Sequence, residues 1–500
     1  MTINKPSLIR PDSFSLKFLK WKFQISTPDL LLIFLILIFA TVAGLQSIAA
    51  HLHYFTNNAD MGFHNQLMYK FAHFKRPSTT LWGDGDQLYN CFGDHMTLLM
   101  PINSQLYWIF GSSGLLVAQI GYCIFGAVGI YKLVVEKCAN KWLALSAVFL
   151  FFSHYSLYAA LVFDAHDNVY GMMFLPWIFL FFFRNNLKWF LISLGIFLMA
   201  REDLALTGMA CGITFLLLGW KGQKRFGVFC FFISLVYFLI AYKLIIPRIS
   251  PISGGYTAWR FQSLGNSISA VLINLFSHPG NIFDLMTNDL EKVEKLNFFL
   301  LTGGALLIFQ PKYIFIFLPT FGTTLFTDSW ALWGNLGHYN IVFSVMLPVV
   351  TVFTVSKIKQ EGIRILLLQI VTGLSFYTLG FVYLQRWTKF DRIFTSNYYA
   401  YRTNRDEIKR AIKMIPDNAS VSATNYLTPH IAFRDKAYMY PILKNADYIL
   451  INEEDRLYLN YPYGSPEAYD AAMKTIYADT LYRIVFNQKH VVLFKRKDLK

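Results

Sequence analysis

An uncharged apolar run from Leu30 to Ala50 constrains the fold of this chain more than any other feature. About 20 consecutive apolar residues are enough to cross the hydrocarbon core of a bilayer as a helix, and this run has that length. Basic residues precede it, as is typical of a cytoplasmic flank. The run is longer than the apolar core of a cleavable signal peptide, so we expect a retained first membrane helix, with residues 1–29 in the cytoplasm.

Further apolar runs recur up to Leu384 and predict about eleven membrane spans. With 55% hydrophobic and only 15% charged residues among 500, the chain is too apolar for an ordinary soluble enzyme. Basic clusters repeatedly fall on the amino-terminal side of the membrane, so the net charge of +15 reflects topology and does not indicate nucleic-acid binding. The predicted fold class is therefore an α-helical polytopic protein of the cytoplasmic (inner) membrane, with a membrane domain at 30–384. Trp189–Ala200 is the weakest predicted span, and removing it would invert the topology of everything after it.

From about Gln385 the long apolar runs end and charged residues become frequent. Alternating helix and strand signals predict a separate, soluble α/β domain at 385–500, on the same extracytoplasmic side as the loop at 51–96. The elements expected in this domain are helices at Asn404–Ile415 and Ser465–Ala478, strands at Ala419–Ala423 and Asp447–Ile451, and a hairpin at Tyr482–Phe494.

The loop at 51–96 concentrates carboxylates, imidazoles and glycines directly after the first predicted helix. Asp60 is a candidate general base, or alternatively the N-cap of a surface helix that begins near Met61. Asp94 and His95 are candidates for an acid/base pair or for binding a divalent cation, although a bare dipeptide is a poor metal signature. The alternative is a polar turn, and the sequence leaves the cofactor unknown.

Ionisable residues also interrupt the later apolar runs, where they are costly unless they are paired or face water. Arg201, Glu202 and Asp203 form such a group. We expect them to line a cavity, with Glu202 as a catalytic candidate, Asp203 as a substrate-binding candidate and Arg201 as a structural partner. His166 is a comparable binding candidate in another polar turn, but a lone histidine is more often structural.

Candidates for recognising a phosphate are Arg248, Arg260 and His338. Guanidinium groups match phosphate oxygens in a bidentate fashion, which favours arginine for this role. The alternative is that both arginines lie at the membrane interface and bind ordinary lipid headgroups.

Several motifs occur in an order and spacing typical of one family. They are Asp60-x-Gly62-x-x-x-Gln66, Phe92-x-Asp94-His95, Arg201-Glu202-Asp203-Leu204, Gly337-His338-Tyr339, and Ile415-Pro416 through Pro429-His430. In these motifs the chain resembles the predicted prokaryotic membrane proteins classed as domain of unknown function 2079, which are grouped with GT-C-type glycosyltransferases.

The resemblance implies a polytopic, GT-C-like transferase that takes a sugar from a polyprenyl-phosphate carrier on the outer leaflet. It implies that the acidic residue of the first outer loop, Asp60, activates the acceptor, and it adds Gln66 and Tyr339 as substrate-binding candidates. The expected partners are the lipid-linked sugar donor and membrane lipid, with no nucleic acid and an unknown acceptor.

A transporter or lipid flippase is the main alternative, since it would also bury charged residues along a path. A transporter typically shows inverted repeats and discontinuous helices at the membrane midplane. This sequence instead has one asymmetric polar loop and a soluble tail, which favours the transferase. A noncatalytic assembly or sensor protein is a third possibility.

Overall fold

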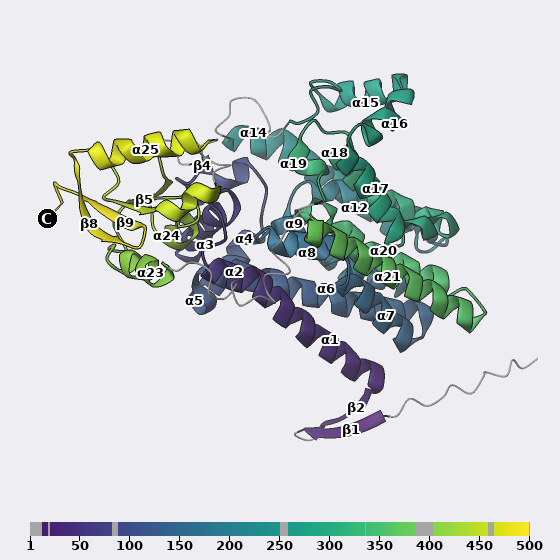
Figure 1. The fold of residues 1–500 in the computed structure, drawn as a ribbon. Coiled ribbons are helices and arrows are strands. Elements are labelled where there is room, and N and C mark those ends of the chain that lie inside the picture. The colour runs from purple at the N-terminus through teal and green to yellow at the C-terminus, as the bar shows by residue number, and fades with distance from the viewer. Residues whose placement is uncertain are drawn as a thin grey trace, which may run out of the picture.

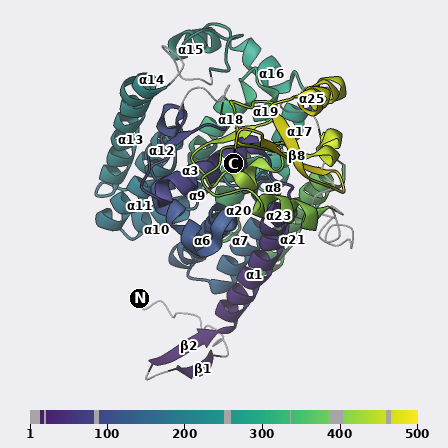
Figure 2. The ribbon, with the colours of Figure 1, turned by 90° about the vertical axis from the view of Figure 1, so that its left-hand side faces the viewer.

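The computed structural model describes residues 13–18, 21–82, 89–250, 259–335, 337–385, 404–458 and 465–499. Most of these residues are helical, and the helices gather into a bundle that carries a small mixed sheet at one end (Figure 1). A hairpin of β1 (Ser13–Phe18) and β2 (Trp21–Ser26) precedes the first helix and lies away from that sheet (Figures 1 and 2).

Five helical segments in the described part of the chain are long and apolar enough to cross a membrane. They are Thr27–Leu52, Met100–Cys138, Lys224–Ile249, His338–Val355 and Glu361–Phe381. The pair of α7 (Lys141–Phe152) and α8 (Tyr155–Val162) is bent by 45° and makes a sixth span if it is counted as one.

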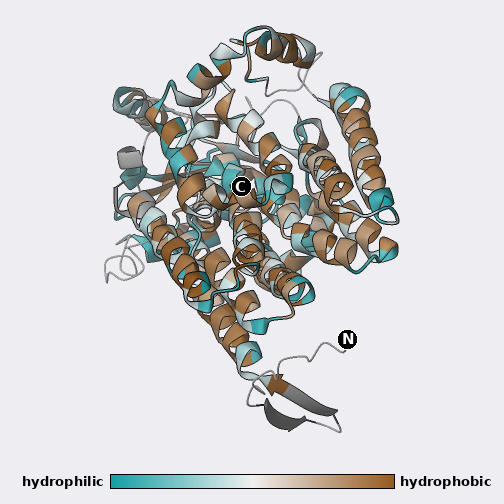
Figure 3. Cartoon of the chain, turned by 90° about the vertical axis from the view of Figure 1, so that its right-hand side faces the viewer, coloured by the Kyte–Doolittle hydropathy of each residue, from teal (hydrophilic) through white to brown (hydrophobic). Residues whose placement is uncertain are grey.

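The predicted total of about eleven spans is not confirmed. The runs at Asp167–Phe183, Leu187–Ala200 and Leu204–Leu218 do form apolar helices, but each has at most 17 residues. At 1.5 Å per residue such helices are shorter than a hydrocarbon core of about 30 Å. The long helices are nevertheless apolar over most of their length, with polar residues at the connecting turns (Figure 3).

The helices pack around α20, in which every residue is buried. The spans and the shorter helices comprise α1 (Thr27–Ala43), α2 (Ala49–Leu52), α6 (Gly114–Cys138), α9 (Asp167–Met172), α10 (Leu175–Phe183), α11 (Leu187–Ala200), α12 (Leu204–Leu218), α13 (Lys224–Leu239), α14 (Ile246–Ile249), α15 (Ile268–Ser277), α16 (Gly280–Thr287), α17 (Leu290–Leu301), α18 (Leu318–Leu325), α19 (Trp330–Trp333), α20 (Ile341–Val355) and α21 (Glu361–Gln385).

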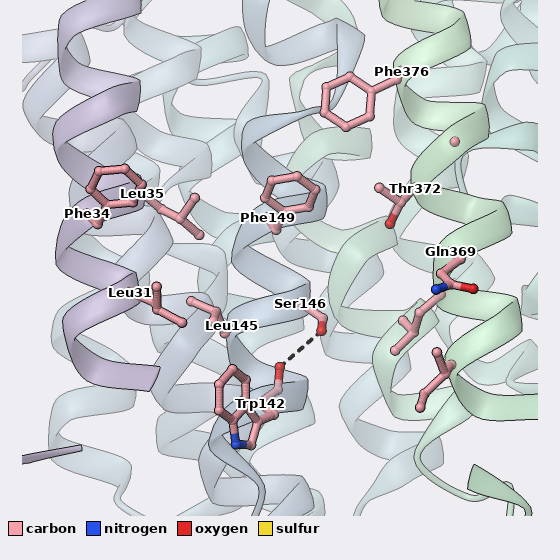
Figure 4. Close-up of a pocket in the computed structure, with 13 residues that line it drawn as sticks. Leu31, Phe34, Leu35, Trp142, Leu145, Ser146, Phe149, Gln369, Thr372 and Phe376 are labelled. Atoms are coloured by element: carbon pink, nitrogen blue, oxygen red, sulfur yellow. Dashed lines mark hydrogen bonds between the residues drawn. The ribbon is translucent and has the colours of Figure 1, made fainter. Parts of the chain in front are cut away.

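An apolar groove of about 730 Å³ lies between α1, α7 and α21 (Figure 4). Phe34, Trp142 and Phe149 are among the residues that line it, and the hydroxyl of Ser146 donates to the carbonyl of Trp142 at 3.0 Å. Because three membrane-type helices form its walls, the groove presents the kind of surface that lipid chains contact, and it is separate from the polar cavity described below.

The loop at residues 51–96, called the first loop from here on, is built from short elements. They are η2 (Asn58–Gly62), α3 (Phe63–Ala72), β3 (Ser78–Thr79), β4 (Tyr89–Asn90) and η3 (Cys91–Gly93). The chain then enters two short helices, α4 (Met100–Asn103) and α5 (Tyr107–Phe110). Pro101 lies in the first turn of α4, and Gly111, which has a positive φ, follows α5.

The tail contains a five-stranded sheet in the order β6-β5-β7-β9-β8. Its elements are α23 (Arg405–Lys413), β5 (Val421–Ala423), α24 (Thr428–Ile431), β6 (Ala437–Met439), β7 (Tyr448–Asn452), α25 (Pro466–Ala478), β8 (Tyr482–Gln488) and β9 (Val491–Arg496). Strand β5 pairs in parallel with β6 and β7, and the hairpin of β8 and β9 completes the sheet in antiparallel fashion. The predicted elements are therefore present, and β6 is the strand that the sequence pattern missed.

The tail packs directly on the first loop. The backbone N–H of Asn58 donates to Oδ1 of Asn425 at 2.8 Å, and Lys70 forms an ion pair of 2.6 Å with Asp435. A Cβ added to Gly62 would lie 3.2 Å from the Thr428 hydroxyl, so glycine permits this close approach. These contacts join the tail to the first loop, so the two segments are not independent of each other in the structure.

Gln66 is the main polar link in this interface. It is fully buried, and its Oε1 accepts from the Thr79 hydroxyl at 2.6 Å and from the Thr80 N–H at 2.9 Å. Its Nε2 donates to the Thr80 hydroxyl at 3.1 Å and to the carbonyl of Arg434 at 3.3 Å. The amide therefore serves the interface, and its position does not support the predicted role in substrate binding.

We expect Gln66→Met to loosen the tail from the first loop. Methionine keeps the length of the side chain but leaves buried partners unpaired, at a cost of about 1–3 kcal/mol for each group that finds no replacement. The measurement is limited proteolysis of the full-length protein in detergent, in which the tail should be released faster. The exposed Gln262→Met is the matched control, and equal cleavage of both variants would contradict this assignment.

Candidate functional site

A polar cavity of about 350 Å³ lies where the first loop meets the ends of the membrane helices. Residues from η2 and α3 form one side of it, and the turn before α9, the turn after α11 and η9 (His338–Asn340) contribute to the others. In Figure 1, α3 lies beside the tail, whereas α8 and α9 lie among the helices of the bundle. Carboxylates, imidazoles and guanidinium groups from distant parts of the chain therefore line the same cavity.

Asp60 lines this cavity from the turn η2. The N-cap of the turn is Asn57, whose side chain accepts from the N–H of Ala59. The alternative that Asp60 is the N-cap is therefore wrong, and its carboxyl is available for another role. Burial raises the pKa of Asp60 to about 7, which suits a group that must both take up and release a proton near neutrality.

His95 is held by a buried carboxylate. Its Nδ1 donates to Oε1 of Glu202 at 2.7 Å, while Oε2 of the same carboxylate accepts from the N–H of Met96 at 2.8 Å. Burial disfavours charge on the imidazole, but Glu202 and Asp94 favour it more strongly, so the pKa of His95 rises to about 9. His95 is therefore a cation at neutral pH, and Glu202 fixes its orientation from outside the cavity lining.

Two arginines contribute further positive charge to the cavity. Arg201 forms a two-point ion pair with Asp203, with Nε donating to Oδ1 at 2.8 Å. Arg260 donates to the hydroxyl of Ser329 at 3.1 Å. Together with His95, these groups are called the cationic region from here on; Asp203 pairs with Arg201 and Glu202 pairs with His95. Guanidinium and imidazolium groups of this kind can donate to the oxygens of an anionic ligand group.

Imidazoles crowd another part of the cavity. His166 and His338 lie with ring centroids 3.7 Å apart, and Nε2 of His166 donates to the carbonyl of Phe163 at 2.6 Å. Nε2 of His64 lies 3.9 Å from Oδ2 of Asp167. Burial lowers the pKa of His64 to about 4, so this ring is neutral near pH 7.

Most of the side chains that the sequence singled out lie at this cavity. Those that line it are Asp60, Asp94, His95, His166, Arg260, His338 and Tyr339. Gln66, Glu202, Asp203 and Arg248 do not line it; Arg248 instead donates to the carbonyl of Leu244 at 2.6 Å. The position of Arg248 therefore does not support the predicted role in phosphate recognition.

Sequence reasoning missed several residues of the lining. They are His64, Trp82 and Cys91, all of which belong to the first loop. Arg201 was predicted to be structural. It does pair with Asp203, but it also lines the cavity. The signal available for His64 was its position one turn after Asp60, which places both residues on the same side of a helix.

The possible divalent-cation site at Asp94 and His95 has no supporting ligand set. Among the described residues, no three histidine, cysteine, aspartate or glutamate side chains are grouped so that they can hold a metal ion. Nδ1 of His95 is already engaged with Glu202. The described side chains therefore favour binding of an anion by cations over binding of a metal.

Solved structures with a similar fold include ArnT from Cupriavidus metallidurans. ArnT bound to undecaprenyl phosphate has 9% sequence identity to this chain and a TM-score of 0.51. Its apo state has 11% identity and a TM-score of 0.50. Both likenesses cover 93% of this chain and 97% of ArnT, so the chain shares its largely helical fold with ArnT.

Family membership follows from the sequence. No curated protein matches the chain. The family model described as "Predicted membrane protein (DUF2079)" matches residues 50–492, which include the first loop, the membrane helices after the first one and nearly all of the tail. The chain therefore belongs to the DUF2079 family of predicted membrane proteins.

Proposed function

We propose that this protein is a membrane glycosyltransferase that transfers a sugar from a polyprenyl-phosphate-linked donor at the outer face of the cytoplasmic membrane. The observation that carries the proposal is the cavity in which the carboxyl of Asp60 lies with the cations His95, Arg201 and Arg260. A transfer of this kind needs a base for the acceptor and positive charge for the departing phosphate, and both are present there.

The roles follow from the charges. Asp60 takes the proton of the acceptor hydroxyl as that oxygen attacks the anomeric carbon of the sugar. The bond from this carbon to the phosphate oxygen breaks, and the cationic region stabilises the negative charge that the lipid phosphate gains. The similarity in fold to ArnT, solved with undecaprenyl phosphate, supports a polyprenyl phosphate as the carrier.

The proposal is tested with the full-length protein in proteoliposomes. Radiolabelled undecaprenyl-phosphate sugars are supplied together with membrane lipids and soluble glycans as acceptors. Appearance of label in an acceptor together with free undecaprenyl phosphate supports glycosyl transfer. Movement of the donor between leaflets with no sugar released would instead favour a flippase.

The plot of transfer rate against pH is expected to be bell-shaped, with a rise centred at about pH 7 and a fall centred at about pH 9. The pKa of Asp60 is raised, so the base is protonated below about 7 and the rate rises as pH increases through that value. The pKa of His95 is also raised, so the cation is lost and the rate falls above about 9. The measurement is kcat/KM across this range, and a single low limb near pH 4 would contradict the assignment.

A further inference from the structure

Several polar atoms of the cavity lining are buried and lack a hydrogen-bond partner among the described residues. They are both ring nitrogens of His338, Nδ1 of His64 and Oδ1 of Asp167. His338 is only 3% exposed and Asp167 only 6%. All three side chains line the same cavity as Asp60.

Such a grouping is uncommon in a folded protein, because a buried polar group without a partner costs free energy. A single unpaired atom can be served by an ordered water molecule. Here the unpaired atoms come from three segments that are far apart in sequence, and they converge on a volume of about 350 Å³. This arrangement indicates a ligand that supplies several hydrogen-bonding groups at once.

The hydrogen-bonding chemistry of these three side chains differs from that of the cationic region. A neutral imidazole offers one N–H donor and one nitrogen acceptor, and an ionised carboxylate only accepts. A phosphate has no need of acceptors, whereas each hydroxyl group of a sugar both donates and accepts. Burial keeps His64 neutral by lowering its pKa to about 4, which matches it to an uncharged ligand group.

Aromatic rings are placed next to these polar atoms. The ring of His338 lies 4.1 Å from that of Tyr339, and Phe63 lies 5.7 Å from Trp82 between ring centroids. Phe63, Trp82 and Tyr339 also line the cavity. The apolar face of a sugar ring can pack on such rings while its hydroxyl groups reach the imidazoles.

We propose that His64, Asp167 and His338 form a subsite that binds the hydroxyl groups of an uncharged sugar, next to the cations that bind phosphate. The inference rests on the proposed function and narrows its substrate class.

The test uses His338→Phe in the full-length protein in detergent. Phenylalanine keeps a ring against His166 and Tyr339 but removes both unpaired nitrogens. Binding is measured by native mass spectrometry with three probes: undecaprenyl phosphate, undecaprenyl phosphate glucose and undecaprenyl phosphate mannose. The exposed His278→Phe is the matched control, and Asp167→Asn reports on the subsite if His338→Phe does not fold.

We expect the unmodified protein to bind at least one sugar-bearing probe more tightly than bare undecaprenyl phosphate. His338→Phe should weaken the binding of that probe by about tenfold and leave the binding of bare undecaprenyl phosphate unchanged. If the binding of all three probes were weakened equally, the inference would be overturned, because His338 would then belong to the phosphate site. Binding of the bare lipid alone would overturn the sugar subsite but leave the lipid partner intact, whereas no binding of any probe would overturn the proposed function itself.

Discussion

Asp60→Asn is expected to lower the rate of sugar transfer by about 10²- to 10⁴-fold, the usual contribution of general-base catalysis. An amide has nearly the size of the carboxyl but cannot take up the proton of the acceptor. The cap of η2 is supplied by Asn57, so the substitution leaves the local fold in place. The change should therefore appear in kcat, measured in proteoliposomes, while the melting temperature in detergent stays nearly constant.

Asp284→Asn is the matched control for this variant, because Asp284 is an exposed carboxylate outside the cavity and its loss should leave transfer unchanged. Full transfer by Asp60→Asn would show that the base is another residue. Asp94 would then be the better candidate, since its carboxyl lines the same cavity.

Glu202→Ala is expected to destabilise the protein by about 3–5 kcal/mol, the usual cost of removing one partner of a buried ion pair. Glu202 is 1% exposed and accepts hydrogen bonds from both His95 and the N–H of Met96. Its removal takes away the carboxylate that accepts from the His95 ring and from the N–H of Met96. Denaturant unfolding in detergent measures the loss.

The exposed Glu361→Ala is the matched control, because it removes a surface pair with Arg364 that contributes about 0–1 kcal/mol. Glu202→Gln separates structure from chemistry. Glutamine can still accept from Met96, but it lacks the charge that raises the pKa of His95, so the upper limb of the pH profile should move down toward about 6.5. If Glu202→Ala lost no more unfolding free energy than Glu361→Ala, the pair of Glu202 and His95 would not stabilise the fold.

The sequence by itself determined the class of the protein, because that class depends on local properties. A run such as Leu30–Ala50 is apolar whatever surrounds it, and the structure has a membrane-type helix over Thr27–Leu52. The tail elements followed from periodicity and caps in the same way. Ser465, for example, caps α25 by accepting from the N–H of Ala468.

The number of spans depended on more than hydropathy. The apolar runs near Leu187–Ala200 and Leu204–Leu218 fold into helices of the expected type, but packing decides how such short helices lie relative to a bilayer. Periodicity also missed β6, which has only three residues and is defined by its pairing with β5.

Only the tertiary structure decided the roles of the polar residues. Glu202 looked like a catalytic acid in the sequence, yet it lies behind His95, a partner 107 positions away. Gln66 belonged to a motif, yet it fastens the tail through Arg434, 368 positions away. A carboxylate or an amide has the same chemistry in either role, so its function depends on which distant groups the packed helices bring within hydrogen-bonding distance.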